Sequence, residues 1–204
     1  GLWFDGIAEN GNLKFLAVPD RGPNGDPLDL DGDGSTESRA FLLPDYQSRV
    51  VSLELNESTG EVSITDELLL TQADGTPITG LPNIPNVDRT AVDAAANPVD
   101  LDDLTQLDAS EFGSDFDPFG ADLEGIVRAG DGTFWMVDEY RPAIYHFNED
   151  GTLIDRFVPE GTVDQANEAN SGTTFTEGTF GTETLPEEYL NRRANRGFEG
   201  MALD

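Results

Sequence analysis

A set of four short apolar segments occurs twice along the chain, and this recurrence constrains the fold more than any other feature of the sequence. The segments are residues 7–8, 13–18, 49–55 and 61–69 in the first set, and residues 123–128, 133–137, 143–147 and 152–157 in the second. Helical periodicity is nearly absent, and turn residues such as Asn10-Gly11 separate the segments, as in β-hairpins. The pattern therefore predicts two units of four antiparallel strands.

The two units also share one register along the sequence. Aligning Asp5-Gly6-Ile7 with Glu124-Gly125-Ile126 places Phe15-Leu16-Ala17-Val18 on Phe134-Trp135-Met136-Val137 without a gap. A third Glu-Gly-aliphatic segment follows at Glu199-Gly200-Met201. Recurring four-stranded units are typical of propellers, because one unit cannot cover its own apolar faces. The predicted fold class is all-β, a β-propeller of four-stranded antiparallel blades.

We expect a single domain over residues 1–204 that covers only part of the ring, since the sequence starts without methionine and ends inside an expected strand at residues 198–203. Its parts are blade 1 at about residues 1–70, an acidic insertion at 71–121, blade 2 at about 122–158, a loop at 159–196 and the start of blade 3 at 197–204. Short helices are expected near residues 100–109 and 186–194. The long connections all emerge on one predicted face, and loops of such length commonly carry function.

Acidic residues dominate the charge of the chain. There are 41 aspartates and glutamates against 11 lysines and arginines, which gives a formal net charge of -30. This balance argues against nucleic acid or an anionic membrane as a partner and favours cations. The chain has no cysteine, so the fold cannot rest on disulfides, and calcium could replace them as a staple. The alternative interpretation of the acidity is a solvated surface suited to salt. The sequence also contains no apolar run long enough to span a membrane.

An aspartate-rich segment gives the clearest chemical signal. Asp29, Asp31 and Asp33 alternate with other residues and are followed by Gly34, a pattern that lets a loop wrap a hard cation such as Ca²⁺. Glu37 would serve as a further ligand, directly or through water. Ala40 stands where an EF-hand has its bidentate glutamate, so another ligand would be needed. The alternative is a solvated turn of aspartates and glycines that binds no ion.

Two acid–arginine segments occupy equivalent places after the second strand of each unit. They are Asp20-Arg21 and Asp138-Glu139-Tyr140-Arg141. Carboxylates that hold a cation beside a guanidinium that grips phosphoryl oxygens would form a metal-assisted phosphate site. The alternative is a pair of ordinary surface salt bridges.

Glu124 and Glu199 open the Glu-Gly-aliphatic segments and are expected beside the central channel of a propeller. Each could serve there as a metal ligand or general base, or as a structural acceptor for backbone N–H groups. Asp5 takes the same place in the first unit, which favours a structural role. His146 is the only histidine and is expected on a strand, so a histidine-dependent catalytic triad is not predicted.

The chain resembles the family described as esterase-like activity of phytase. The resemblance rests on three blocks: residues 16–22, residues 122–140 and residues 195–200. It implies a propeller that extends beyond Asp204, a secreted location, extracellular or periplasmic, and an activity on phosphate esters or related esters that uses Ca²⁺. The acidic insertions at residues 26–37 and 71–118 depart from the family pattern and could reshape the substrate face.

Two functional hypotheses follow. The first is a calcium-dependent phosphoester hydrolase that acts on a small-molecule phosphate ester. Its catalytic residues would be Glu139, Arg141, Arg21 and Arg196, and its metal ligands Asp29, Asp31, Asp33, Glu37, Asp20, Glu124, Asp138 and Glu199. The second is a non-catalytic, calcium-stabilised extracellular scaffold or assembly subunit, in a surface layer or filament.

Overall fold

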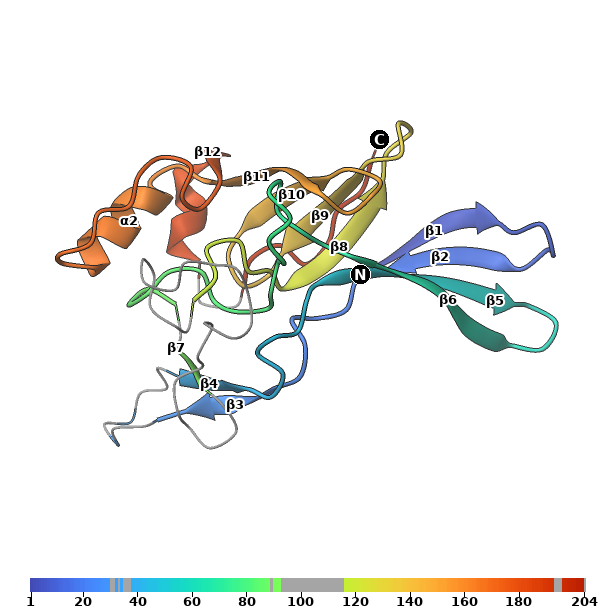
Figure 1. The fold of residues 1–204 in the computed structure, drawn as a ribbon, viewed down its shortest axis with the longest axis horizontal. Coiled ribbons are helices and arrows are strands. Elements are labelled where there is room, and N and C mark those ends of the chain that lie inside the picture. Colours follow the sequence, from blue (N-terminus) through green and yellow to red (C-terminus); the bar gives the residue numbers. More distant parts are fainter. Residues whose placement is uncertain are drawn as a thin grey trace.

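The chain is mostly β-structure arranged in three sheets (Figure 1). The computed structural model describes residues 1–29, 32, 34, 38–88, 90–92, 116–192 and 196–203. The strands are β1 (Leu2–Ile7), β2 (Leu13–Ala17), β3 (Asn24–Leu28), β4 (Ser38–Phe41), β5 (Arg49–Asn56), β6 (Glu61–Leu69), β7 (Thr90–Val92), β8 (Leu123–Arg128), β9 (Phe134–Asp138), β10 (Ala143–Phe147), β11 (Leu153–Pro159) and β12 (Thr182–Leu185). The helices are α2 (Thr162–Ala169) and a 3-10 helix, η1 (Glu187–Asn191).

The two predicted units form the two main sheets. The first sheet has the order β1-β2-β5-β6, with antiparallel neighbours throughout. The second has the order β12-β11-β10-β9-β8, in which only β12 is parallel to its neighbour. These pairings confirm the predicted antiparallel β-fold. Within the residues that the structure describes, the sheets do not close into a ring, so the propeller itself stays a prediction.

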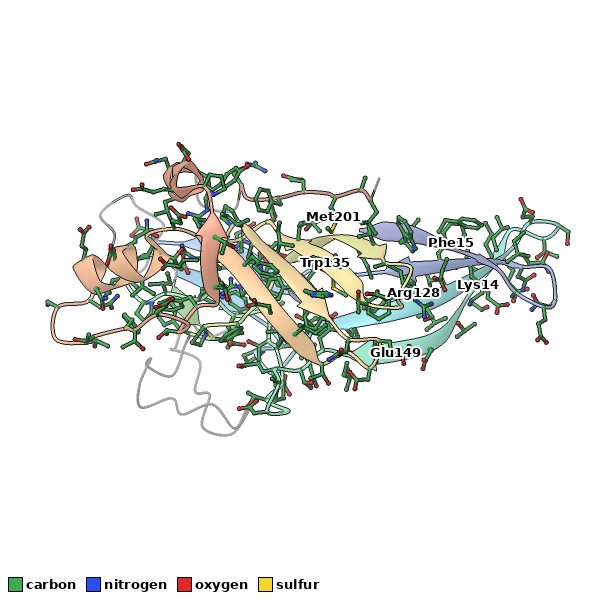
Figure 2. The ribbon with its side chains drawn as sticks, turned by 90° about the horizontal axis from the view of Figure 1, so that it is seen from above. Lys14, Phe15, Arg128, Trp135, Glu149 and Met201 are labelled. Atoms are coloured by element: carbon green, nitrogen blue, oxygen red, sulfur yellow. The ribbon has the colours of Figure 1, made fainter. Side chains whose placement is uncertain are left out.

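The main core lies where the two sheets meet. Leu16 and Val50 of the first sheet pack in one buried cluster with Ile126, Phe134 and Met136 of the second. At one end of this junction Lys14, Arg128 and Glu149 line a shared cavity (Figure 2). The recurring apolar positions are therefore explained by sheet-on-sheet burial.

Glycine at position 125 allows the segment that follows residue 196 to approach β8 closely. A Cβ atom at Gly125 would lie 2.8 Å from Val137 Cγ2 and 3.0 Å from the Cα of Gly200. The N–H groups of Gly197 and Phe198 donate to the carbonyls of Glu139 and Asp138 at 2.6 Å and 2.9 Å. The strand expected over residues 198–203 is not formed, because these two bonds tie the segment to the end of β9 without a ladder.

The connections contain more regular structure than the sequence predicts. The small sheet β3-β4-β7 was not expected, and neither was α2, which lies inside the predicted loop at residues 159–196. Of the two expected helices, the one near residues 186–194 appears as η1, and the one near residues 100–109 falls outside the described residues. Neither helix in the described part of the chain is long and apolar enough to cross a bilayer.

Candidate functional site

Three carboxylates from different parts of the chain converge beside the start of β8. Asp20 follows β2, Asp122 immediately precedes β8, and Glu124 is the second residue of that strand. One oxygen from each lies within 4.8 Å of the other two. Asp20 is exposed, Glu124 is half-buried and Asp122 is buried, so the group opens to solvent on one side.

Two further glutamates extend this group. Glu139 follows β9 and Glu199 lies in the segment that approaches β8, and both act electrostatically on Glu124 or on each other. Arg196 lies between them, with Nη1 3.6 Å from Glu139 Oε1 and 3.8 Å from Glu199 Oε1. The Arg196 side chain is 69% exposed and therefore available to a ligand. We call Asp20, Asp122, Glu124, Glu139 and Glu199 the acidic cluster.

Arg21 holds Asp122 in place in the acidic cluster. Its Nε donates to Asp122 Oδ2 at 2.8 Å, and its Nη2 also pairs with that oxygen. The guanidinium is buried and stacks over the Tyr140 ring at 4.1 Å. Because both its charge and its flat face are engaged, Arg21 acts as a positioning residue for Asp122.

The cluster carries more negative charge than Arg21 neutralises. Burial and the neighbouring Asp122 raise the pKa of Asp20 to about 6. Burial and the charge of Asp122 also raise the pKa of Glu124 and of Glu139. Burial alone would raise the pKa of Asp122 as well, but Arg21 and the hydrogen bond with Asp20 outweigh it and lower the pKa. A cation bound here would relieve the repulsion that keeps protons on the other carboxylates.

The geometry fits a calcium ion. Calcium takes oxygen ligands at about 2.3–2.6 Å, so two oxygens on one ion are no more than about 5 Å apart. The oxygens of Asp20, Asp122 and Glu124 meet this limit. Glu139 and Glu199 add negative charge beside these three carboxylates.

Asp138 is buried behind the acidic cluster. Its Oδ1 accepts the N–H groups of Tyr140 at 2.8 Å and of Asp122 at 3.3 Å. Arg156 lies 3.7 Å from Oδ2. Burial outweighs that arginine and raises the pKa of Asp138 to about 7. The carboxyl group therefore supports the backbone that carries Asp122 and lies on the protein side of the site.

Arg141 is paired with residues outside the acidic cluster. It is fully buried, and its Nη2 donates to Asp88 Oδ1 at 2.7 Å while Nη1 donates to Gln165 at 3.2 Å. Asp88 also accepts the N–H groups of Asn83 and Ile84. The predicted partnership of Arg141 with phosphate would require this buried ion pair to open.

The aspartate-rich segment is described only in part. Asp29 is exposed, and its two carboxylate oxygens accept the N–H groups of Gly32 at 2.6 Å and Gly34 at 2.9 Å. This is the local turn that the solvated alternative predicts. Asp31, Asp33 and Glu37 lie outside the described residues, so the calcium loop stays a prediction.

Comparison with known proteins bears on the acidic cluster. The family described as Phytase-like, esterase-like activity of phytase, matches residues 5–204. The chain belongs to this family. The matched range of the phytase-like chain contains every residue of the acidic cluster, together with Arg21 and Arg196.

A curated relative of this phytase-like chain is an uncharacterised secreted protein of Arthroderma benhamiae. The two are 29% identical over 209 residues, which cover 84% of the chain and 38% of the relative. The chain thus spans well under half the length of this relative. The description of the relative as secreted agrees with the extracellular location that the sequence predicts. No solved structure matches the chain significantly.

Asp122 is the cluster residue that sequence reasoning missed. It directly precedes a predicted strand and stands two residues before Glu124, so the two carboxylates were placed on one side of the chain. That spacing is a local signal from which Asp122 could have been predicted as a ligand. Its partner Arg21 is 101 residues away in sequence, and no local pattern shows such a contact.

Proposed function

We propose that the chain is part of a secreted, calcium-dependent phosphoester hydrolase of the phytase-like type. The observation that carries this proposal is the convergence of Asp20, Asp122 and Glu124 within 4.8 Å, beside an exposed arginine. Asp20, Asp122 and Glu124 would hold the ion, with Glu139 and Glu199 beside it. A bound Ca²⁺ would supply positive charge that attracts and polarises a phosphate ester.

The remaining roles are assigned to side chains around the ion. Arg196 would turn from Glu139 and Glu199 to donate to phosphoryl oxygens, where it stabilises the charge that develops. Glu139 is half-buried and has a raised pKa, which suits it to take a proton from water or give one to the leaving group. Arg21 would keep Asp122 ionised and oriented. Arg141 would support the loop through Asp88 and Gln165.

The same proposal includes the propeller architecture. We assign residues 1–70 to one blade, with the acidic insertion at 71–121, and residues 122–158 to the next blade. The loop at 159–196 would then lead to a third blade. The close approach of Gly200 to Gly125 supports this, because it sets two Glu-Gly-aliphatic segments side by side as neighbouring inner strands require.

A non-catalytic calcium-stabilised scaffold is the second candidate. It is favoured by the buried pairing of Arg21 with Asp122 and of Arg141 with Asp88, which commits two of the four candidate catalytic groups to folding. In this case calcium at the acidic cluster would fasten loops together and contribute stability alone.

Measurements of phosphate release by site variants and by a matched control variant distinguish the hydrolase from the scaffold. Phytate, a nucleotide and a generic phosphomonoester would each be incubated with the protein in Ca²⁺ or in a chelator. The hydrolase predicts calcium-dependent release that Glu139→Gln and Arg196→Ala each lower by about 10²-fold or more, with little change in melting temperature. Glu57→Gln, in an exposed hairpin turn, is the matched control. No release from any substrate by the calcium-saturated protein would contradict the hydrolase.

A further inference from the structure

The turn between β5 and β6 contains a sequence motif that the proposed function does not use. It is Asn56-Glu57-Ser58, an asparagine followed two positions later by a residue with a hydroxyl group. Asparagine, any residue except proline, and then serine or threonine form the acceptor motif for N-linked glycosylation. In the 204-residue sequence no other asparagine is followed in this way. Three-residue matches are frequent in proteins, so the surroundings of Asn56 determine whether it can act as an acceptor.

The motif lies at an exposed hairpin turn. Asn56 is the last residue of β5, and Glu61, which pairs with it, is the first residue of β6. Residues 57–60 between them are all exposed, and Asn56 itself is half-buried. Figure 1 shows this turn at the tip of the first sheet, at the right of the view. An enzyme can therefore reach the turn without opening the sheet.

The side-chain oxygen of Asn56 is held by the turn. Asn56 Oδ1 accepts the N–H group of Ser58 at 3.0 Å and that of Thr59 at 3.2 Å. The Ser58 hydroxyl also donates to Oδ1, at 2.6 Å. Because backbone N–H groups only donate, these contacts identify the accepting atom as the oxygen and the other terminal atom as the amide nitrogen, Nδ2.

The amide nitrogen of Asn56 is left available by the same arrangement. Within the described part of the chain, Asn56 Nδ2 donates no hydrogen bond. By contrast, Asn10 and Asn12 at the neighbouring hairpin turn both donate from Nδ2 to Glu54 at 3.0 Å. Asn56 therefore combines a fixed oxygen with an uncommitted nitrogen, and the hydroxyl of Ser58 lies beside it. These are the groups that N-linked glycosylation requires of an acceptor.

We propose that Asn56 is a site of N-linked glycosylation, modified during secretion. Nδ2 attacks C1 of the first sugar of an oligosaccharide carried on a polyisoprenyl diphosphate. A bond forms between Nδ2 and C1, the bond from C1 to the diphosphate oxygen breaks, and the polyisoprenyl diphosphate leaves with that electron pair. Nδ2 gives one proton to a base of the transferase. Such lipid-linked donors are held in the membrane that secreted proteins cross, and the relative of Arthroderma benhamiae is described as secreted.

A glycan on Asn56 would lie at the opposite end of the first sheet from the acidic cluster. β2 and β5 are antiparallel, and Ala17 at the end of β2 pairs with Val51 near the start of β5. Asp20 therefore follows the end of the sheet at which β5 begins, whereas Asn56 is at the end at which β5 finishes. The glycan would leave the acidic cluster open, so this inference is independent of calcium binding and of ester hydrolysis.

Peptide mapping of the secreted protein tests the proposal. The complete protein would be secreted from a yeast, whose secretory pathway carries out this reaction, and digested with trypsin. The peptide that contains Asn56 would be analysed by mass spectrometry before and after peptide-N-glycosidase treatment in heavy-oxygen water, which converts a glycosylated asparagine to labelled aspartate. Asn148 is the matched control in the same protein, because it is exposed in the turn between β10 and β11 and is followed two positions later by Asp150.

We expect a glycan on the peptide that contains Asn56 and none on Asn148. Ser58→Ala, which keeps the asparagine and removes the hydroxyl, should abolish the modification, whereas Ser58→Thr should retain it. An unmodified Asn56 in the secreted wild-type protein would overturn the proposal, whether or not the variants fold. Equal modification of Ser58→Ala and the wild type would also overturn it, since the hydroxyl would then have no part in the reaction. Calcium binding and phosphate release, measured on the same protein, test the proposed function separately.

Discussion

Two acid–arginine segments that look equivalent in sequence differ in the folded chain. After β2, Asp20 is exposed in the acidic cluster and Arg21 fixes Asp122 beside it. At the end of β9, Asp138 is fully buried, and Arg141, three residues further on, is paired with Asp88. The first segment therefore supplies Asp20 and fixes Asp122 in the candidate metal site, whereas the second supplies Glu139 to the acidic cluster and uses Asp138 and Arg141 to support the fold behind it. The difference lies in the partners that distant parts of the chain bring to each segment.

Removal of Arg141 should have the largest effect on stability. Arg141→Ala leaves the carboxylate of Asp88 buried without its cation, which costs about 3–5 kcal/mol of unfolding free energy. Denaturant unfolding measures this loss, with and without calcium. Because Asp88 lies outside the acidic cluster, calcium should stabilise this variant and the wild type equally. A larger stabilisation of Arg141→Ala by calcium would place Arg141 at the metal site. It would contradict the difference drawn here between Arg21 and Arg141.

Removal of Arg21 should also destabilise the chain, but calcium should repair part of the damage. Arg21→Ala leaves Asp122 buried without its partner, and a cation in the acidic cluster would neutralise that charge. At about 100 times the dissociation constant, calcium adds about 2.7 kcal/mol of stability to a protein that binds it. We expect the increase in melting temperature on adding calcium to exceed that of the wild type. An equal or smaller increase would show that Asp122 does not contact the ion.

The affinity for calcium should depend on pH through Asp20. Its folded pKa is raised from 3.8 to about 6, so a proton competes with the ion below pH 6. One such proton weakens calcium binding about tenfold between pH 7 and pH 5. Without calcium, the folded state binds the proton of Asp20 more tightly than the unfolded state does. The free energy of unfolding therefore falls as the pH rises from about 4 to 6.

Calorimetric titration at pH 7 and pH 5 measures the change in affinity. Asp20→Asn should reduce the difference between the two pH values, whereas Glu57→Gln should leave it intact. The same pH dependence in Asp20→Asn and in the wild type would remove Asp20 from the site.

Removal of Arg196 should have the smallest effect on stability. Its side chain is 69% exposed, and its contacts with Glu139 and Glu199 exceed 3.5 Å. Surface pairs of this kind contribute about 0–1 kcal/mol, so Arg196→Ala should melt within a few degrees of the wild type. A loss as large as that of Arg141→Ala would mean that Arg196 supports the fold, and a catalytic role would lose its main argument.

Local patterns in the sequence predict the strands well and the site only in part. Turn residues and apolar alternation locate seven of the eight strands of the two units, because hairpin pairing is a local property. The first strand, expected at residues 7–8, lies instead at Leu2–Ile7. The helix α2 is missed because it is eight residues long and is stabilised by packing of Ala166 against Ile84, Phe175 and Phe180. A helix so short has little periodicity of its own to detect.

The burial of charged groups explains the other differences. Asp20 lies three residues beyond the end of β2, whereas Asp138 is the last residue of β9, and the register shared by the two units places Asp20 on Glu139. Long-range contacts then decide how deeply the charged groups around these positions are buried. Asp88 is 53 residues from Arg141, and Asp122 is 101 residues from Arg21. Such pairs depend on how the two sheets and their loops come together, which one sequence read locally does not reveal.

The most direct test of the account is calcium binding by a variant that lacks the three convergent carboxylates. Asp20→Asn, Asp122→Asn and Glu124→Gln would be combined and titrated with calcium in salt that screens the bulk negative charge. A matched control would remove three exposed charges elsewhere, Glu57→Gln, Glu61→Gln and Asp66→Asn. We predict that the wild type and the control share a calcium site that the cluster variant has lost. Equal affinity and stoichiometry in all three proteins would contradict a metal site at Asp20, Asp122 and Glu124.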